Sequence, residues 1–227
     1  MDNFNLPDFN IDFGNFDPQD ISSDETINAV LVVDVSPSVC NYVNELNAAF
    51  KDFLEEMHRS HVAEKLMVSI IEFNDAINVR SGFQPVNSID LQKINFNPCG
   101  GGTALYDAVL AGITNAVNYR TNLENSGVNC KTLIFTITDG EDNSSQNPAK
   151  NVKKVLQDIL KDEKNAFSFE TILFGVGNDS SFENAQKAMG ISHLARIGNS
   201  GKEIRKMIGF ISASISKSSG NKVQVVF

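Results

Sequence analysis

The stretch AVLVVDVSPS, residues 29–38, carries the strongest signal of fold in this chain. Its opening residues are apolar without a break, which is typical of a β-strand that is buried on both faces of a parallel sheet. Asp34, Ser36 and Ser38 follow directly, so polar oxygen atoms stand where that strand would end. In open α/β sheets, ligands bind at the carboxyl ends of the strands, where the connecting loops meet. The stretch therefore predicts a central parallel strand with a polar site at its end.

Two further segments place polar residues at the boundary of a predicted element, one before a helix and one after a strand. In CGGGTALYDA, residues 99–108, Thr103 follows three glycines and opens an amphipathic run. In TLIFTITDGEDN, residues 132–143, Asp139 follows a second buried strand. The candidate site has oxygen donors and neither His nor Cys, a donor set that suits a hard cation such as Mg²⁺. The predicted metal ligands are Asp34, Ser36, Ser38, Thr103 and Asp139.

In this order and spacing, these residues resemble the metal-ion-dependent adhesion site of the von Willebrand factor A domain family. The family pattern is Asp-x-Ser-x-Ser, then a Thr, then an Asp, and the similarity covers roughly residues 26–216. One position departs from the pattern, because Pro37 stands where the family usually has a small residue. Proline stiffens the loop and removes one backbone N–H donor near the site.

The resemblance implies a mechanism of partner binding. It gives Ser36 and Ser38 direct bonds to Mg²⁺, and gives Asp34 and Asp139 contacts mainly through water. Thr103 would join the metal when a ligand is bound. A metal held in this way stays electrophilic and takes an Asp or Glu side chain from another protein. Mn²⁺ or Ca²⁺ would serve as substitutes.

The rest of the chain alternates strands and helices, which predicts an α/β fold with a doubly wound, mostly parallel central sheet. Helices would cover both faces, and one short strand would pair antiparallel at an edge. A domain over residues 26–217 would hold all of these elements. The expected strands are 27–34, 66–73, 76–80, 132–138, 167–174 and 192–196, and the expected helices are 41–59, 104–119, 148–161, 181–188 and 202–216.

The two ends of the chain have a different composition. Residues 1–25 hold seven acids and no base, and four phenylalanines are spaced by polar residues: Phe4, Phe9, Phe13 and Phe16. High charge and few aliphatic residues favour a disordered or loosely draped tail. The phenylalanines favour a docking segment that contacts a partner, and both interpretations stay open. The tail 218–227 ends in VQVVF, which would add an edge strand or bind elsewhere.

Composition excludes several classes of protein. A net charge of −9 argues against nonspecific binding of nucleic acid, which depends on clustered Lys and Arg. Three scattered cysteines fit neither a disulfide framework nor a zinc site, and they favour a reducing compartment. The sequence shows neither a signal peptide nor an apolar stretch long enough to span a membrane. We therefore expect a cytoplasmic protein, and the layout is similar to prokaryotic intracellular members of the family, such as those of tellurite-resistance operons. A bacterial or phage origin and a secreted or surface-adhesion role both stay open.

Two alternatives to an adaptor function stay open at this stage. One is a phosphotransferase of the haloacid-dehalogenase type with Asp34 as nucleophile. The motif of that family is Asp-x-Asp, in which the second Asp serves as general acid. This chain has Ser36 at that position, so the general acid is missing. The other is a structural subunit whose metal site is idle. We expect no enzymatic activity, and we expect Asp107, Glu141 and Asp142 to be neighbours of the site rather than ligands.

Overall fold

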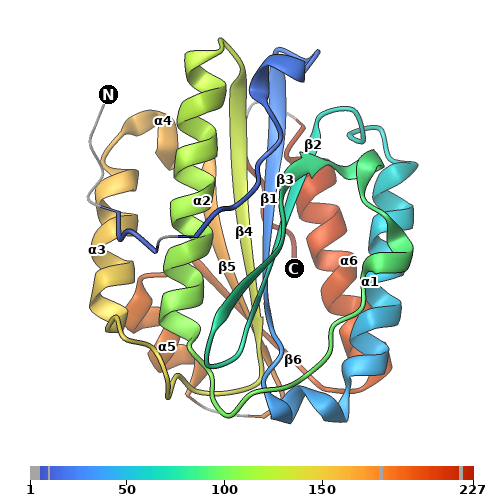
Figure 1. Ribbon diagram of the computed structural model, residues 1–227, viewed down its shortest axis with the longest axis vertical. Coiled ribbons are helices and arrows are strands. Elements are labelled where there is room, and N and C mark those ends of the chain that lie inside the picture. Colours follow the sequence, from blue (N-terminus) through green and yellow to red (C-terminus); the bar gives the residue numbers. More distant parts are fainter. Residues whose placement is uncertain (1–5, 10, 179–180, 220–221) are drawn as a thin grey trace.

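The computed structural model describes residues 6–9, 11–178, 181–219 and 222–227. The strands form one six-stranded sheet in the order β3-β2-β1-β4-β5-β6 (Figure 1). Neighbouring strands are parallel except at one edge, where β3 runs antiparallel to β2. The predicted fold class is therefore confirmed. The strand bounds are β1 Glu25–Asp34, β2 Leu66–Phe73, β3 Ile77–Pro85, β4 Asn129–Thr138, β5 Phe169–Val176 and β6 His193–Ile197.

Helices cover both faces of the sheet, as the alternating sequence pattern predicts (Figure 1). The α-helices are α1 Val43–His58, α2 Leu105–Asn125, α3 Ala149–Leu160, α4 Glu163–Ala166, α5 Phe182–Met189 and α6 Gly201–Lys217. Short 3₁₀ helices are η1 Pro18–Asp20, η2 Pro37–Asn41, η3 Val86–Ser88 and η4 Leu91–Lys93. The main differences from expectation are lengths, since β3 and α2 each extend several residues beyond the predicted end.

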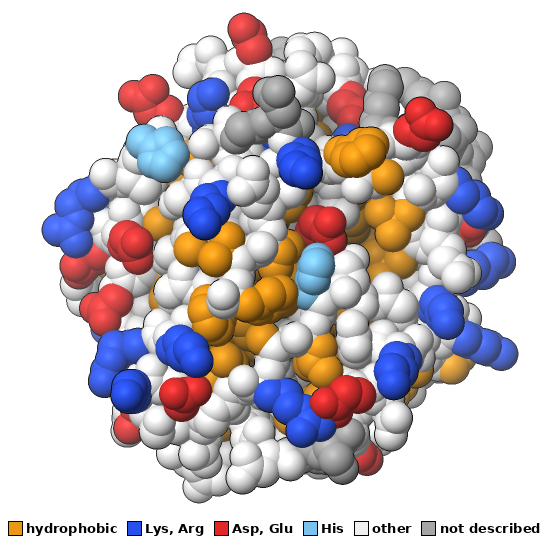
Figure 2. Space-filling view, turned by 180° about the vertical axis from the view of Figure 1, so that it is seen from behind, with side chains coloured by type: hydrophobic (Ala, Val, Ile, Leu, Met, Phe, Trp, Pro, Cys, Tyr) orange, Lys and Arg blue, Asp and Glu red, His pale blue; other side chains and the backbone are white. Residues whose placement is uncertain are grey.

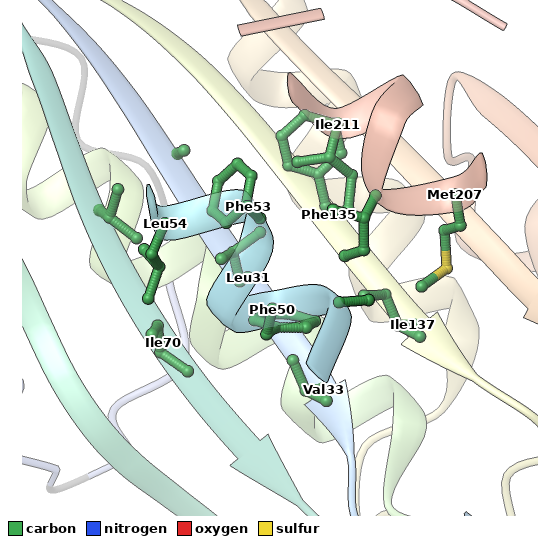
Figure 3. Close-up of a cluster of buried hydrophobic side chains, with 14 of the residues drawn as sticks. Leu31, Val33, Phe50, Phe53, Leu54, Ile70, Phe135, Ile137, Met207 and Ile211 are labelled. Carbon is green, nitrogen blue, oxygen red and sulfur yellow. The ribbon is translucent and has the colours of Figure 1, made fainter. Parts of the chain in front are cut away.

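The apolar residues of the central strands divide between two cores, one on each face of the sheet. Leu31 and Val33 of β1 pack against α1 and α6, together with Phe50 and Phe53 (Figure 3). Val30 and Val32, which point the other way, pack against α2 and belong to the core that α2 and α3 cover. Alternate residues of a strand face opposite sides of the sheet, so a continuous apolar run is needed to fill both cores.

The N-terminal segment packs on the domain's own surface. Figure 1 shows it crossing α2 before the chain enters β1. Phe9, Phe13 and Phe16 are partly buried against the core on the α2 face. The backbone N–H of Phe16 donates a 2.6 Å hydrogen bond to the carbonyl of Phe83 in β3. The described phenylalanines therefore contact this chain itself, whereas Phe4 lies outside the described residues.

A side-chain hydrogen bond and a glycine fix the path of this segment. The amide of Asn15 donates a 2.9 Å hydrogen bond to the side-chain oxygen of the fully buried Asn115 in α2. Gly82 in β3 lies directly beneath the segment. A Cβ atom at Gly82 would stand 1.8 Å from the carbonyl oxygen of Phe13, so only glycine allows this close passage.

The C-terminal tail forms no additional strand within its described part, residues 222–227. The N–H of Val223 donates to the carbonyl of Phe167 at 3.0 Å, and the N–H of Val226 donates to the Ser214 hydroxyl at 3.0 Å. The tail thus lies against α6 and the entry to β5, which answers the question that its sequence leaves open. Among the described residues, no helix is both long and apolar enough to cross a membrane.

Candidate metal centre

The topology places two of the predicted ligands at the carboxyl ends of adjacent central strands. Asp34 is the last residue of β1, and Asp139 directly follows the last residue of β4. From β1 the chain goes first to β2 on one side and later to β4 on the other. A crevice between the connecting loops is expected where strand order reverses in this way, and ligands of α/β sheets bind there.

Hydrogen bonds connect three of the predicted ligands. The Ser38 hydroxyl donates a 2.7 Å hydrogen bond to Oδ1 of Asp139. The hydroxyls of Ser36 and Ser38 lie 3.1 Å apart. Because Ser38 gives its proton to the carboxylate, Ser36 is the donor in that second contact. With the protons pointing in this direction, from Ser36 to Ser38 and from Ser38 to Asp139, each serine oxygen keeps a lone pair that is available to a cation.

Asp34 is almost completely buried, with 1% of its surface exposed. Its Oδ1 accepts a 2.8 Å hydrogen bond from the backbone N–H of Ser36. Its Oδ2 accepts a 2.6 Å hydrogen bond from the hydroxyl of Thr138, the last residue of β4. Both carboxylate oxygens therefore have protein donors, which fixes the carboxylate beneath the two serines.

Thr103 joins the same edge of the sheet through the loop that follows β4. Its backbone N–H donates to the side-chain oxygen of Asn143 at 2.8 Å, and its carbonyl accepts from the N–H of Asn143 at 3.0 Å. Gly102 allows this contact, because a Cβ atom there would lie 2.0 Å from the Ser144 hydroxyl. Among the described residues, the Thr103 hydroxyl has no hydrogen-bond partner, so it is free to bind a ligand.

Two acids beside Thr103 organise the same loop. The carboxylate of Asp107 accepts hydrogen bonds from the backbone N–H groups of Gln146 and Asn147, at 2.7 and 3.0 Å. The carboxylate of Asp142 accepts from the N–H of Tyr106 at 3.1 Å. Both acids are therefore neighbours that hold the loop against the start of α2.

Burial raises the pKa of both carboxyl groups of the centre. The pKa of Asp34 lies above its ordinary value chiefly because it is desolvated, although hydrogen bonds from Thr138 and Ser36 oppose the shift. Burial likewise raises the pKa of Asp139, and hydrogen bonds from Ser38 and Tyr42 lower it again in part. Two desolvated carboxyl groups so close together are better accommodated with a nearby cation than without one.

The donor set fits a hard cation. Within the described part of the chain, no three His, Cys, Asp or Glu side chains come together as a metal-binding group. Hydroxyl oxygens must therefore supply part of any coordination here, and oxygen-only ligands suit Mg²⁺. Pro37 does not disturb this arrangement, because it occupies the first turn of η2, where its missing N–H costs no helical hydrogen bond.

Sequence reasoning missed three residues that support the site: Thr138, Tyr42 and Asn143. Thr138 is the last residue of β4 and directly precedes Asp139, so the face of the sheet on which its side chain lies could have been predicted from the two-residue period of β4. Tyr42 reaches Asp139 from the residue before α1, and Asn143 reaches Thr103 across the loop. Neither of these contacts has a local sequence signal, because each depends on how loops from different strands meet.

Comparison with known proteins identifies similar folds but no similar sequences. No sequence model of a protein family matches the chain, and no curated protein is a significant match to it. Many solved structures are similar at low identity, and three of them are representative. A von Willebrand factor type A structure from Catenulispora acidiphila is 13% identical with a TM-score of 0.59, and the match covers 85% of this chain and 43% of that one.

The second structure is the pilus adhesin SpaC of Lactobacillus rhamnosus GG in its open conformation, 16% identical with a TM-score of 0.58, covering 86% of this chain and 30% of that one. The third is proximal thread matrix protein 1 of the mussel byssus with a zinc-occupied MIDAS motif, the metal-ion-dependent adhesion site. It is 14% identical with a TM-score of 0.56, and the match covers 83% of this chain and 45% of that one. The chain thus spans less than half the length of each of these proteins. Its sheet order, its covering helices and these similarities show that it has the fold of a von Willebrand factor type A domain.

Proposed function

We propose that this protein is a metal-dependent interaction module that binds an Asp or Glu side chain of another protein. The metal would be Mg²⁺, with Mn²⁺ or Ca²⁺ as substitutes. It would be held by the five predicted ligands, Asp34, Ser36, Ser38, Thr103 and Asp139. A bound divalent cation would supply a Lewis-acidic centre that attracts an external carboxylate.

The observation that carries the proposal is the hydrogen-bonded series from Ser36 through Ser38 to Asp139, set directly above the buried carboxylate of Asp34. It supports the two roles that the proposal needs. The serine oxygens keep lone pairs for direct contact with a cation. The carboxylates are engaged by protein hydroxyls and N–H groups, so they would neutralise little of the cation's charge by direct contact.

Two of the similar structures are in keeping with this proposal. One is a pilus adhesin, and another has zinc in a site of the same kind. We propose for this chain a protein partner and neither nucleic acid nor membrane. We also propose a cytoplasmic location, and the prokaryotic intracellular members of the family stay the predicted relatives.

Enzymatic phosphotransfer has less support. A nucleophilic carboxylate needs a free oxygen that can reach the substrate. Asp34 is 1% exposed, and its two oxygens already accept from Ser36 and Thr138. We therefore propose a binding function without catalysis. Covalent uptake of beryllofluoride at Asp34 would contradict this proposal.

The experiment is a pull-down with the tagged full chain, run in parallel in Mg²⁺ and in EDTA, followed by mass spectrometry. A Ser36→Ala/Ser38→Ala variant should lose every partner that EDTA removes. A Ser22→Ala variant serves as the matched control, because Ser22 is exposed and precedes the domain. Partners that the double variant retains undiminished would overturn metal-bridged docking and leave the site with a structural role.

A further inference from the structure

The charge of this chain is strongly divided along its length. Residues 187–227 contain seven basic side chains and one acid, a net charge of +6 in a protein whose total is −9. The acid is Glu203. Most of the bases lie on or beside α6, the helix that covers one face of the sheet together with α1. A basic surface of this kind in an acidic protein indicates a local function rather than an average property of the surface.

The basic side chains of α6 share one exposed side of the helix. Lys202, Lys206 and Lys217 are all exposed and follow one another at helical spacing. Between them lie the small residues Gly209 and Ala213, so the backbone of this side is accessible. Within the described part of the chain, none of these three lysines has a carboxylate partner within salt-bridge distance. Their charges are therefore available to a ligand.

Apolar side chains lie beside these lysines. Phe227 is 54% exposed, and its ring lies 6.1 Å from that of Phe210 and 5.7 Å from that of His193. Phe210, Val225 and Ala195 are only partly buried against the core. The ammonium group of Lys206 lies 5.6 Å from the centre of the Phe210 ring, so the cationic and apolar parts are in contact.

We define the C-terminal face as these apolar side chains together with the three lysines of α6: Ala195, Phe210, Val225, Phe227, Lys202, Lys206 and Lys217. Figure 2, which views the molecule from behind, shows hydrophobic side chains gathered near the middle of the surface with Lys and Arg side chains around them. An apolar centre with a charged rim is the usual anatomy of a protein-binding surface.

We propose that the C-terminal face binds an acidic segment of a partner protein, one in which Asp and Glu alternate with Phe, Leu or Ile. The ammonium groups of the lysines would pair with the Asp and Glu carboxylates of the segment. The partly exposed rings of Phe210 and Phe227 would pack against its apolar side chains. This surface is separate from the candidate metal centre, so binding to it requires no divalent cation.

Other occupants fit the same surface less well. A second copy that docked its own C-terminal face on this one across a two-fold axis would place the lysines of α6 against each other, which is unfavourable. A nucleic acid strand would bring phosphates close to Glu170, which lies 3.2 Å from His193 beside the Phe227 ring. An anionic membrane would need a broader set of inserted apolar side chains than Phe227 and its neighbours supply.

The test is a selection of random dodecapeptides displayed on phage against the immobilised full chain, carried out in EDTA. The recovered peptides are then measured by fluorescence anisotropy against the wild type and a Lys206→Glu/Lys217→Glu variant. We expect enrichment of Asp and Glu next to Phe, Leu or Ile, and roughly tenfold or greater loss of affinity in the variant. The matched control is Lys150→Glu/Lys154→Glu, which reverses two exposed lysines of α3 on the opposite face.

A second variant, Phe227→Ser, tests the apolar part without changing charge, and an unchanged Tm shows that each variant is folded. Peptides without acidic enrichment, or peptides that bind the Lys206→Glu/Lys217→Glu variant as well as the wild type, would overturn the proposal. Tighter binding of oligo(dT) or of phosphatidylserine vesicles through the same lysines would also overturn it. The Ser36→Ala/Ser38→Ala variant should bind the peptides normally, so failure here is distinct from failure of the metal-dependent function.

Discussion

The hydroxyl of Thr138 donates a 2.6 Å hydrogen bond to the buried carboxylate of Asp34, and this bond joins residues 104 positions apart in the sequence. It connects the ends of β1 and β4, the two central strands, at the edge where the candidate metal centre lies. The Thr138 side chain is fully buried. The bond therefore links the stability of the sheet to the geometry of the site.

Replacing Thr138 by Val tests this link. The change keeps the shape of the side chain and removes a donor from a buried carboxylate, so we expect a loss of about 1–3 kcal/mol in the free energy of unfolding. Urea denaturation measures it. Thr132→Val is the matched control on the same strand, because the buried Thr132 hydroxyl has no hydrogen-bond partner among the described residues. That control should be neutral or stabilising, and equal effects of the two changes would contradict the role of Thr138.

Stabilisation by Mg²⁺ should depend on the two serines. A ligand that binds only the folded state raises its stability by mass action, so saturating Mg²⁺ should raise the Tm of the wild type. The Ser36→Ala/Ser38→Ala variant should keep its fold and lose this increase. Differential scanning fluorimetry with and without EDTA measures both. An equal increase in the variant would show that Mg²⁺ binds elsewhere.

The same increase in Tm should depend on pH. Burial raises the pKa of Asp34 and Asp139 above 3.8, so without metal the folded state binds protons more tightly than the unfolded chain. The stabilising contribution of these protons is complete below 3.8 and is lost as pH rises through the raised pKa values. Mg²⁺ replaces the protons, so its effect on Tm should grow with pH and vanish in acid. Scans at about pH 4 to pH 8 measure this, and a constant Mg²⁺ effect would contradict it.

The N-terminal segment should contribute to stability. In Gly82→Ala, the new Cβ would collide with the Phe13 carbonyl, so we expect a loss of about 1–3 kcal/mol and easier proteolysis of residues 6–24. Gly209→Ala is the control of opposite sign. Its Cβ meets nothing within 4 Å, and alanine stabilises an exposed helix position by about 0.5–1 kcal/mol relative to glycine.

Deletion of residues 1–24 extends this test. It would expose apolar surface on α2 and leave the side-chain oxygen of Asn115 without the donor that Asn15 provides. We therefore expect a lower Tm. An unchanged Tm would mean that the segment rests on the domain without stabilising it, and would favour its alternative interpretation as a docking segment for a partner.

The sequence by itself determined the fold class and the order of its elements. The continuous apolar run of β1 and the largely apolar core of β4 can be read locally, because a strand buried on both faces needs apolar side chains in both directions. Polar residues directly after such strands must lie at their carboxyl ends. Asp34 and Asp139 could therefore be predicted to share one edge of the sheet without knowledge of any contact between them.

Only the tertiary structure decided which hydrogen bonds hold these residues and where the N-terminal segment lies on the domain. Thr138 donates to Asp34 from the end of β4, and Asn143 accepts from the N–H of Thr103, and in both pairs the sequence distance hides the contact. The path of the phenylalanine-rich segment depends on Gly82 and Asn115, which lie far from it in the chain. Contacts of this kind leave no local period in a sequence, because they arise only when the packed sheet and helices bring distant segments together.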